Sequence, residues 1–170
     1  MNAHENRTYY TCMSGEFYVL AQLFSRGYMA SLTYGNAKSV DILVSSEAGK
    51  MFKVEVKTAR KEQIYGSDKS QFGANYEWQM WQTHEEKIDE NLYYCFVMLR
   101  GTQQIPKFFI VRSKDVADYV KREHTFWLGI PRTGKVKNVD KRIFRIGLMP
   151  KSHGLKPIGD YEDAWHTLPP

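Results

Sequence analysis

The chain is poor in the residues that stabilise disulfide-rich or cysteine-bound zinc domains. Only two cysteines, Cys12 and Cys95, occur among its 170 residues, so neither a disulfide framework nor a cysteine zinc site is indicated. No apolar run approaches the ~18 residues that a membrane span needs, and the polar amino terminus lacks the apolar core of a signal peptide. Repeats and low-complexity tracts are absent too. We therefore expect one globular domain, residues 1–170, in the cytoplasm and without a membrane partner.

Several common catalytic motifs are missing as well. Segment 131–135 contains Gly-Lys but lacks the upstream glycine and the following Ser or Thr of a phosphate-binding P-loop. The histidines are scattered without a metal-ligand spacing, and no G-x-S-x-G elbow occurs. Cys12 has no candidate base near it in the sequence. These absences argue against P-loop nucleotide binding, histidine metal sites and nucleophilic acyl transfer.

Two segments of alternating polarity, 40–44 and 51–57, predict a pair of strands. The short link between them carries a glycine at a natural turn position, which predicts an antiparallel hairpin. Centring the turn on Ala48 places the apolar residues of both strands on one face. The expected apolar pairs are Val40 with Val56, Ile42 with Val54, and Val44 with Phe52.

The same register places Asp41 directly across from Glu55 on the other face, with their Cβ atoms roughly 5 Å apart. Two like charges in this position are destabilising unless a cation neutralises them, and hard divalent cations prefer oxygen ligands. Lys57 follows on the same face, where its ammonium could hold a phosphate oxygen or a water molecule. The arrangement suits metal-assisted phosphodiester hydrolysis. An exposed hairpin with a charged face is the alternative interpretation.

A predicted helix adds another carboxylate. Apolar residues at helical spacing, a possible N-cap at Ser14 and a glycine at position 27 predict an amphipathic helix over 15–27. The residues expected on its apolar face are Phe17, Leu20, Ala21, Phe24 and Tyr28. Glu16 would lie in the first turn, where the helix dipole favours a carboxylate. Glu16 also shares a stripe with Leu20 and Leu23, which would direct it towards the hairpin.

These motifs resemble those of the PD-(D/E)XK, or restriction-endonuclease-like, nucleases. The resemblance covers about residues 14–60 and rests on Gly15-Glu16, on Val40-Asp41-Ile42-Leu43 and on Val54-Glu55-Val56-Lys57-Thr58. The spacing is most similar to that of Holliday junction resolvase-like members. One departure is that the family's proline before the aspartate is Val40 here.

The resemblance implies roles for five residues. Asp41, Glu55 and the carbonyl of Val56 would bind Mg²⁺ or Mn²⁺, Lys57 would position water or stabilise charge, and Glu16 would complete the catalytic site. It also implies an α/β fold with a mixed central β-sheet flanked by helices. The expected αβββαβ core spans about residues 14–125, followed by a carboxyl-terminal extension over about 126–170.

The rest of the chain supplies further elements. A helix is expected around 84–91, followed by a buried central strand over 92–99 and another strand over 107–112. Ser113 is expected to cap a helix with Val116, Tyr119 and Val120 on one face. An edge strand over 143–148 and a short helix over 161–167, with Tyr161, Trp165 and Leu168 facing inward, complete the prediction.

Charge suggests a polyanionic partner. The net charge is +5 and the isoelectric point is about 9.1, which suits nucleic acid without requiring it. The residues predicted to contact DNA are Arg60, Lys61, Lys69, Arg132, Lys135, Lys137, Lys141 and Arg142. The aromatic residues of segment 63–82 could stack on unpaired bases or cover a core.

The expected function is therefore a Mg²⁺-dependent endonuclease that hydrolyses DNA phosphodiester bonds, in a structure-specific or resolvase-like manner. A noncatalytic DNA-binding or assembly module that retains the fold is the alternative. A homodimer is possible, because cutting both strands symmetrically would require a two-fold axis.

Overall fold

The computed structural model describes residues 3–33, 40–60, 72–131, 133–134, 140–147, 156–157 and 160–170. The chain divides into two compact units. Unit 1 consists of Met1–Gln63, Asn91–Val111 and Gly159–Pro170, and unit 2 consists of Ile64–Glu90 and Arg112–Ile158. The expectation of a single domain stays a prediction.

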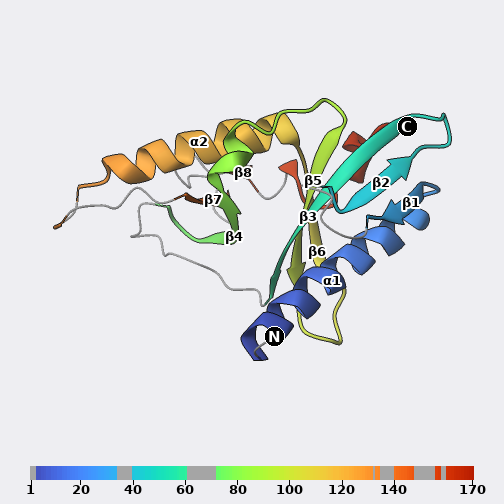
Figure 1. The fold of residues 1–170 in the computed structure, drawn as a ribbon, viewed down its shortest axis with the longest axis horizontal. Coiled ribbons are helices and arrows are strands. Elements are labelled where there is room, and N and C mark those ends of the chain that lie inside the picture. The colour runs from blue at the N-terminus through green and yellow to red at the C-terminus, as the bar shows by residue number, and fades with distance from the viewer. Residues whose placement is uncertain are drawn as a thin grey trace. The chain divides into compact units, whose positions relative to one another are not determined.

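Unit 1 is built on a five-stranded mixed sheet (Figure 1). Its strands lie in the order β1-β2-β3-β5-β6, with β1, β2 and β3 antiparallel and β3 parallel to β5. The bounds are Met29–Leu32 for β1, Ile42–Ser45 for β2, Met51–Arg60 for β3, Leu92–Leu99 for β5 and Lys107–Arg112 for β6. An α/β architecture with a mixed sheet is thereby confirmed, whereas the specific αβββαβ core stays a prediction.

Helix α1, Ala3–Phe24, begins well before the predicted residue 15. Ser14 is therefore inside the helix, where its hydroxyl donates to the Tyr10 carbonyl at 2.6 Å, and its predicted role as N-cap is wrong. The helix ends as expected. Gly27 adopts φ +85°, and the Tyr28 N–H donates to the Leu23 carbonyl at 3.1 Å. This pattern is a glycine-terminated C-cap, in which a positive φ costs glycine little.

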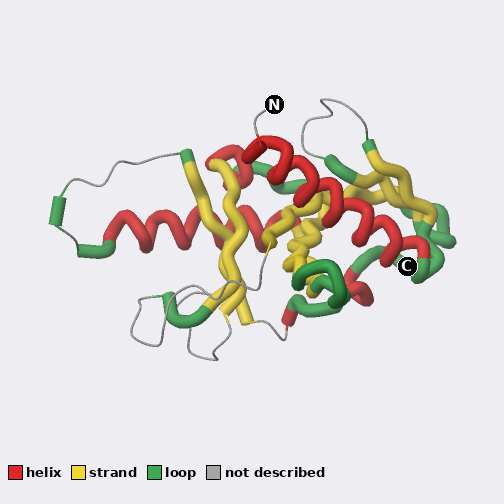
Figure 2. Tube along the Cα trace, turned by 90° about the horizontal axis from the view of Figure 1, so that it is seen from below, coloured by secondary structure: helices red, strands yellow, loops and turns green. Residues whose placement is uncertain are grey.

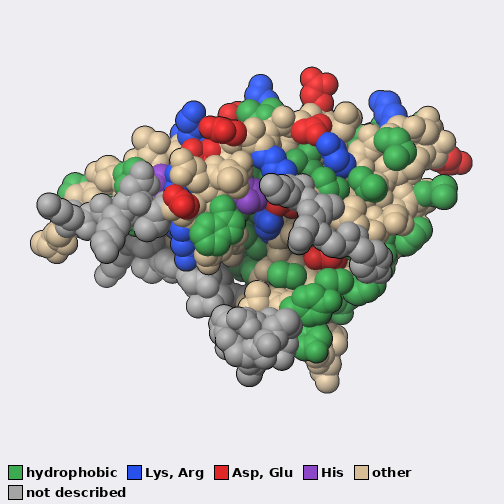
Figure 3. All heavy atoms as spheres, viewed as in Figure 1, with side chains coloured by type: hydrophobic (Ala, Val, Ile, Leu, Met, Phe, Trp, Pro, Cys, Tyr) green, Lys and Arg blue, Asp and Glu red, His purple; other side chains and the backbone are tan. Residues whose placement is uncertain are grey.

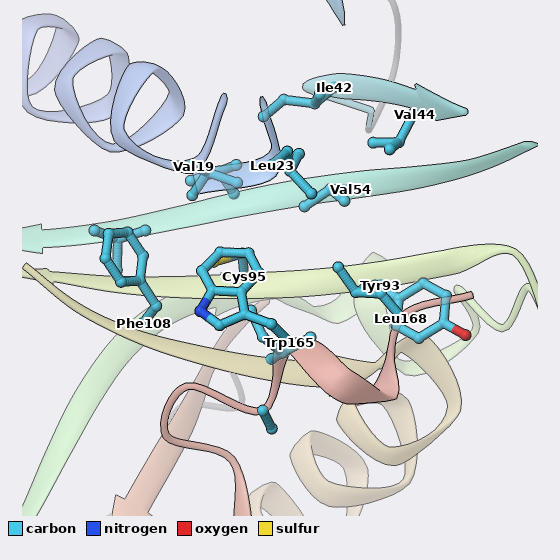
Figure 4. Packing of buried hydrophobic residues seen from close by; sticks show 14 of the residues in the cluster. Val19, Leu23, Ile42, Val44, Val54, Tyr93, Cys95, Phe108, Trp165 and Leu168 are labelled. Carbon is cyan, nitrogen blue, oxygen red and sulfur yellow. The ribbon is translucent and has the colours of Figure 1, made fainter. Parts of the chain in front are cut away.

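The inward face of α1 differs in part from the predicted one. Val19 and Leu23 are fully buried in the core of unit 1, whereas Phe17 and Phe24 are more than half exposed. Figure 4 shows Val19 and Leu23 on the side of α1 that faces β3. The reason is steric, because Gly15 packs directly against Thr58 of β3 and sets which stripe of the helix meets the sheet.

The β2–β3 hairpin has the predicted register. Ile42 pairs with Val54 and Val44 with Phe52, and all four residues are buried. The predicted pairing of Val40 with Val56 is not part of the ladder, because β2 begins only at Ile42.

Strand β5 is the central buried strand that the sequence predicted. All eight of its residues are buried, and it lies between β3 and β6. The α-helix expected around 84–91 is wrong, because residues 82–85 form a short 3-10 helix, η1 (Gln82–Glu85). The buried ring of His84 is held there by its Nδ1, which lies 3.0 Å from the Trp81 carbonyl oxygen.

Unit 2 contains a three-stranded sheet of β4 (Asn75–Trp81), β7 (Lys141–Gly147) and β8 (Lys156–Pro157), and helix α2 (Ser113–Gly129). Figure 2 shows these strands and helices along the Cα trace. Strand β7 lies between β4 and β8, so its prediction as an edge strand is wrong. Because β4 pairs with β7 along its full length, both ladder edges of β7 are used.

Helix α2 has the predicted buried face, since Val116, Tyr119 and Val120 are at most 1% exposed. Ser113 is its first residue and not its cap. The Ser113 hydroxyl instead donates to the Asp89 carbonyl at 2.7 Å. Among the described residues, no helix is both long enough and apolar enough to span a membrane.

The carboxyl-terminal residues 160–170 return to unit 1. The predicted helix over 161–167 is reduced to the 3-10 helix η3, Trp165–Thr167. Trp165 and Leu168 are nevertheless buried in the core of unit 1, as predicted, while Tyr161 is only half-buried.

Candidate catalytic site

Strand β3 supplies a buried carboxylate next to an amine. Glu55 and Lys57 alternate onto the same face of the strand, and Glu55 is only 3% exposed. The Lys57 Nζ lies 2.5 Å from Glu55 Oε1. A carboxylate so deeply buried needs a compensating positive charge, and Lys57 provides one.

Asp41 reaches the same strand from the hairpin partner. It immediately precedes β2, and its Oδ2 accepts the Val56 N–H at 2.6 Å. The Asp41 N–H donates to the Val54 carbonyl at 3.1 Å. The backbone therefore bends at Asp41, which is why β2 starts at the next residue. The bend brings the Asp41 carboxylate to the Val56 N–H, between Glu55 and Lys57 in β3, and the predicted catalytic role of these residues stays a prediction.

Glu16 joins this group from α1. It lies in the middle of the helix, so the predicted position in the first turn is wrong and the helix dipole does not explain a carboxylate here. The pKa of Glu16 is raised to about 7, chiefly by burial and also by the charge of Asp41, while the charge of Lys57 lowers it. Glu16, Asp41 and Lys57 therefore share one electrostatic environment.

Sequence reasoning missed two neighbours of these residues. Tyr94 of β5 is the register partner of Glu55, and the pKa of its phenol is raised by burial and by the charge of Glu55. Cys12 lies one helical turn before Glu16, and burial together with the Glu16 charge raises the pKa of its thiol. For Tyr94 the only signal in the sequence was a polar-tipped residue inside a strand of apolar side chains.

The donor set is compatible with a hard cation. Asp41, Glu55 and the Val56 carbonyl offer oxygen atoms alone, which is what Mg²⁺ and Mn²⁺ prefer. The burial of Glu55 means that a cation there would be screened little by solvent. Among the described residues, no three His, Cys, Asp or Glu side chains are grouped to hold a metal ion. The predicted set has only two carboxylates and depends on a backbone oxygen.

The predicted DNA-contacting residues fall into different environments. Arg60 and Lys141 are exposed, whereas Arg142 is 4% exposed and its Nε donates to Glu85. Arg142 is thus part of a structural ion pair of unit 2 and not of an exposed basic surface. The other five, Lys61, Lys69, Arg132, Lys135 and Lys137, lie outside the described residues. On the face drawn in Figure 3, the coloured Lys and Arg side chains lie among Asp and Glu side chains.

The aromatic segment mostly covers a core. Tyr76 and Trp78 of β4 are at most 4% exposed, and Phe72 makes an edge-to-face contact with Phe126 at 5.6 Å between ring centroids. Trp81, at the end of β4, is 55% exposed. Among the described aromatic residues of this segment, Trp81 is therefore the main candidate for stacking on a base.

Comparison with known proteins gives a likeness of fold. No protein-family model matches the chain, and no curated protein matches it. The structure is similar to that of I-Ssp6803I, a bacterial homing endonuclease, with a TM-score of 0.52 and 13% sequence identity. The match covers 92% of this chain and 86% of the homing endonuclease. The chain therefore shares a fold with a known endonuclease, and its assignment to the PD-(D/E)XK superfamily stays a prediction.

Proposed function

We propose that the protein is a Mg²⁺- or Mn²⁺-dependent endonuclease that hydrolyses phosphodiester bonds of DNA. The observation that carries the proposal is the meeting of Asp41, buried Glu55 and Lys57 at one stretch of β3. The half-buried Glu16, whose pKa is raised to about 7, lies within electrostatic reach. The fold shared with a homing endonuclease and the net charge of +5 support a DNA substrate.

Each residue has a distinct task in this proposal. Asp41, Glu55 and the Val56 carbonyl would hold the cation, which supplies a water molecule of lowered pKa and positive charge at the scissile phosphate. Lys57, already paired with Glu55 at 2.5 Å, would neutralise the charge that develops on the phosphate oxygens. Glu16, whose ionised form is present near pH 7, would orient the attacking water and accept its proton.

Tyr94 has a positioning role. Its side chain is fully buried beside Glu55, and a phenol that stays protonated can donate to one carboxylate oxygen while the other oxygen remains available. The carboxylate of Glu55 is thereby fixed in direction before any substrate arrives, as catalysis by a preorganised site requires.

The first prediction tests this site with isosteric variants. Asp41→Asn, Glu55→Gln and Lys57→Met should each reduce cleavage roughly a hundredfold or more, since each removes a charge aimed at the reacting group. Glu47→Gln and Lys50→Met change exposed charges in the turn of the same hairpin and should leave cleavage unchanged. The assay is nicking of labelled linear, branched and supercoiled DNA with Mg²⁺ or Mn²⁺, with circular dichroism to confirm folding.

Two results would refute the proposal. Cleavage by the wild-type protein that persists in EDTA would exclude the metal-dependent reaction. Salt-sensitive DNA binding without product in either cation would identify a noncatalytic DNA-binding module, and the branched substrate would show whether cleavage depends on DNA structure.

A further inference from the structure

The amino-terminal half of α1 forms a wall of two adjoining pockets in unit 1. The first has a volume of about 300 Å³. The residues that line it are Arg7, Thr8, Thr11, Cys12, Thr58 and Arg60. The second, of about 600 Å³, shares Arg7 and Arg60 and continues to Tyr18 and to Gly101 beyond the end of β5. The two pockets together form a groove, which we name the Arg7–Arg60 groove.

The two arginines in the groove differ from the two buried arginines of unit 2. Arg142 and Arg145 are at most 5% exposed and form ion pairs with Glu85, Glu77 and Glu123. Arg7 and Arg60 are exposed, and among the described residues neither forms an ion pair with a carboxylate. Their charge is therefore available to a ligand from outside the chain.

Arg60 is also held in place. Its Nε donates to Thr11 Oγ1, and that hydroxyl donates to the Arg7 carbonyl at 2.8 Å. A guanidinium fixed through one N–H keeps its remaining donors in a planar fork that matches phosphate oxygens. Thr58 Oγ1, which has no hydrogen-bond partner among the described atoms, is a further polar group in the wall of the groove.

The groove borders the candidate catalytic site. Thr58 follows Lys57 in β3 with its side chain on the opposite face of the strand. Cys12, which lines the groove, lies within electrostatic reach of Glu16, Asp41 and Lys57. Arg60 lies three positions after Lys57 in the extended strand, a rise of about 10 Å. This rise corresponds to roughly two or three nucleotides along the axis of a DNA duplex.

We propose that the Arg7–Arg60 groove binds the phosphodiester backbone of the DNA two or three nucleotides away from the bond that is cut. This inference rests on the proposed function for the identity of the polyanion. It makes Arg7 and Arg60 substrate-positioning residues, because they would contact phosphates that do not react. Arg60 was predicted to contact DNA, whereas Arg7 was not, since the predicted helix began only at residue 15.

The test measures DNA binding without cleavage, in EDTA, as a function of salt. For the Arg7→Gln/Arg60→Gln variant, the slope of log affinity against log salt concentration should fall by about two units, roughly one for each phosphate that the variant can no longer neutralise. Affinity should fall roughly tenfold for each arginine. Lys50→Gln, which removes one positive charge at an exposed turn, should keep the wild-type slope. Arg7→Gln alone removes no side-chain bond of the described fold, so it separates binding from folding.

The outcomes separate this inference from the proposed function. A wild-type slope in the double variant would overturn the groove while leaving the nuclease proposal intact. A reduced slope in a protein that never cleaves would support the groove and refute the nuclease. If both hold, cleavage by Arg7→Gln should show a raised KM with little change in kcat, because Arg7 would bind its phosphate equally well in the ground and transition states.

Discussion

The two glutamates of the candidate site, Glu16 and Glu55, lie in surroundings that disfavour their charged forms. Glu55 is buried and balanced by Lys57, while Glu16 is half-buried and faces the negative charge of Asp41. Such arrangements destabilise the folded state, and they are common where function requires them. The cost should be measurable in the protein without metal.

Glu16 should make the protein less stable as pH rises. Its pKa in the folded protein, about 7, lies above the ordinary value of 4.5, so between these values the folded state binds more protons than the unfolded state. The free energy of unfolding therefore falls as pH rises through this window. Glu16→Gln removes this effect, so in EDTA the variant should be more stable than wild type at pH 8 and about equally stable at pH 4.

Urea denaturation at both pH values provides the measurement. Glu47→Gln, at an exposed position of the β2–β3 turn, serves as the control and should give no such difference between the two pH values. Equal stabilities of Glu16→Gln and wild type at pH 8 would contradict the raised pKa of Glu16.

At the scale of elements, the contact between α1 and β3 decides where Glu16 lies. A Cβ on Gly15 would overlap with Thr58 Oγ1 and would lie 2.9 Å from Thr58 Cβ and Cγ2. The glycine thus permits a close approach that no other residue allows. The same close contact between α1 and β3 holds Glu16, the next residue, within electrostatic reach of Asp41 and Lys57.

Gly15→Ala should therefore destabilise the protein, although alanine is the better helix former by about 1 kcal/mol. Overpacking against β3 should cost roughly 1–3 kcal/mol, and cleavage should fall because Glu16 is displaced. Thr58→Ala in the same chain should recover part of both losses, since it removes Oγ1 and Cγ2. Gly129→Ala, in the last position of α2 with open space around it, is the matched control and should not destabilise. Thermal and urea unfolding report the stability.

At the scale of the whole molecule, the chain leaves unit 1 after β3 and returns to it twice. Residues 91–111 supply β5 and β6, and residues 159–170 add a final segment beside β6. The Ile110 N–H donates to the Tyr161 carbonyl at 2.9 Å, and the Asp163 N–H donates to the Phe108 carbonyl at 2.9 Å. Unit 1 is therefore completed only by the last residues of the sequence.

Removing the packing of this final segment should weaken unit 1 as a whole. The Trp165 ring lies 5.5 Å from that of Phe108 between centroids, and the Arg26 guanidinium stacks 4.5 Å from its centre. Trp165→Ala should lower the free energy of unfolding by roughly 3–5 kcal/mol, as for other buried aromatic truncations. His166→Ala changes an exposed neighbour and should have little effect. Circular dichroism during urea denaturation gives both values, and equal stability of the two variants would show that the segment is not needed for the core.

The sequence by itself determined the features that depend on short-range patterns. Alternation of apolar residues predicted the β2–β3 register, a continuous apolar run predicted the central strand β5, and Gly27 predicted the end of α1. These succeed because side-chain periodicity and the backbone freedom of glycine are local properties. For the same reason the sequence placed Asp41 beside the segment of β3 that carries Glu55 and Lys57, where its carboxylate accepts the Val56 N–H.

Only the tertiary structure decided features that depend on distant partners. The inward face of α1 follows from the contact of Gly15 with Thr58, and no periodicity within the helix encodes it. The sequence predicted that Arg142 contacts DNA, but Arg142 is buried in the fold, where it forms an ion pair with Glu85. The raised pKa of Glu16 likewise arises from burial and from Asp41, because desolvation and charge act through space and not along the chain.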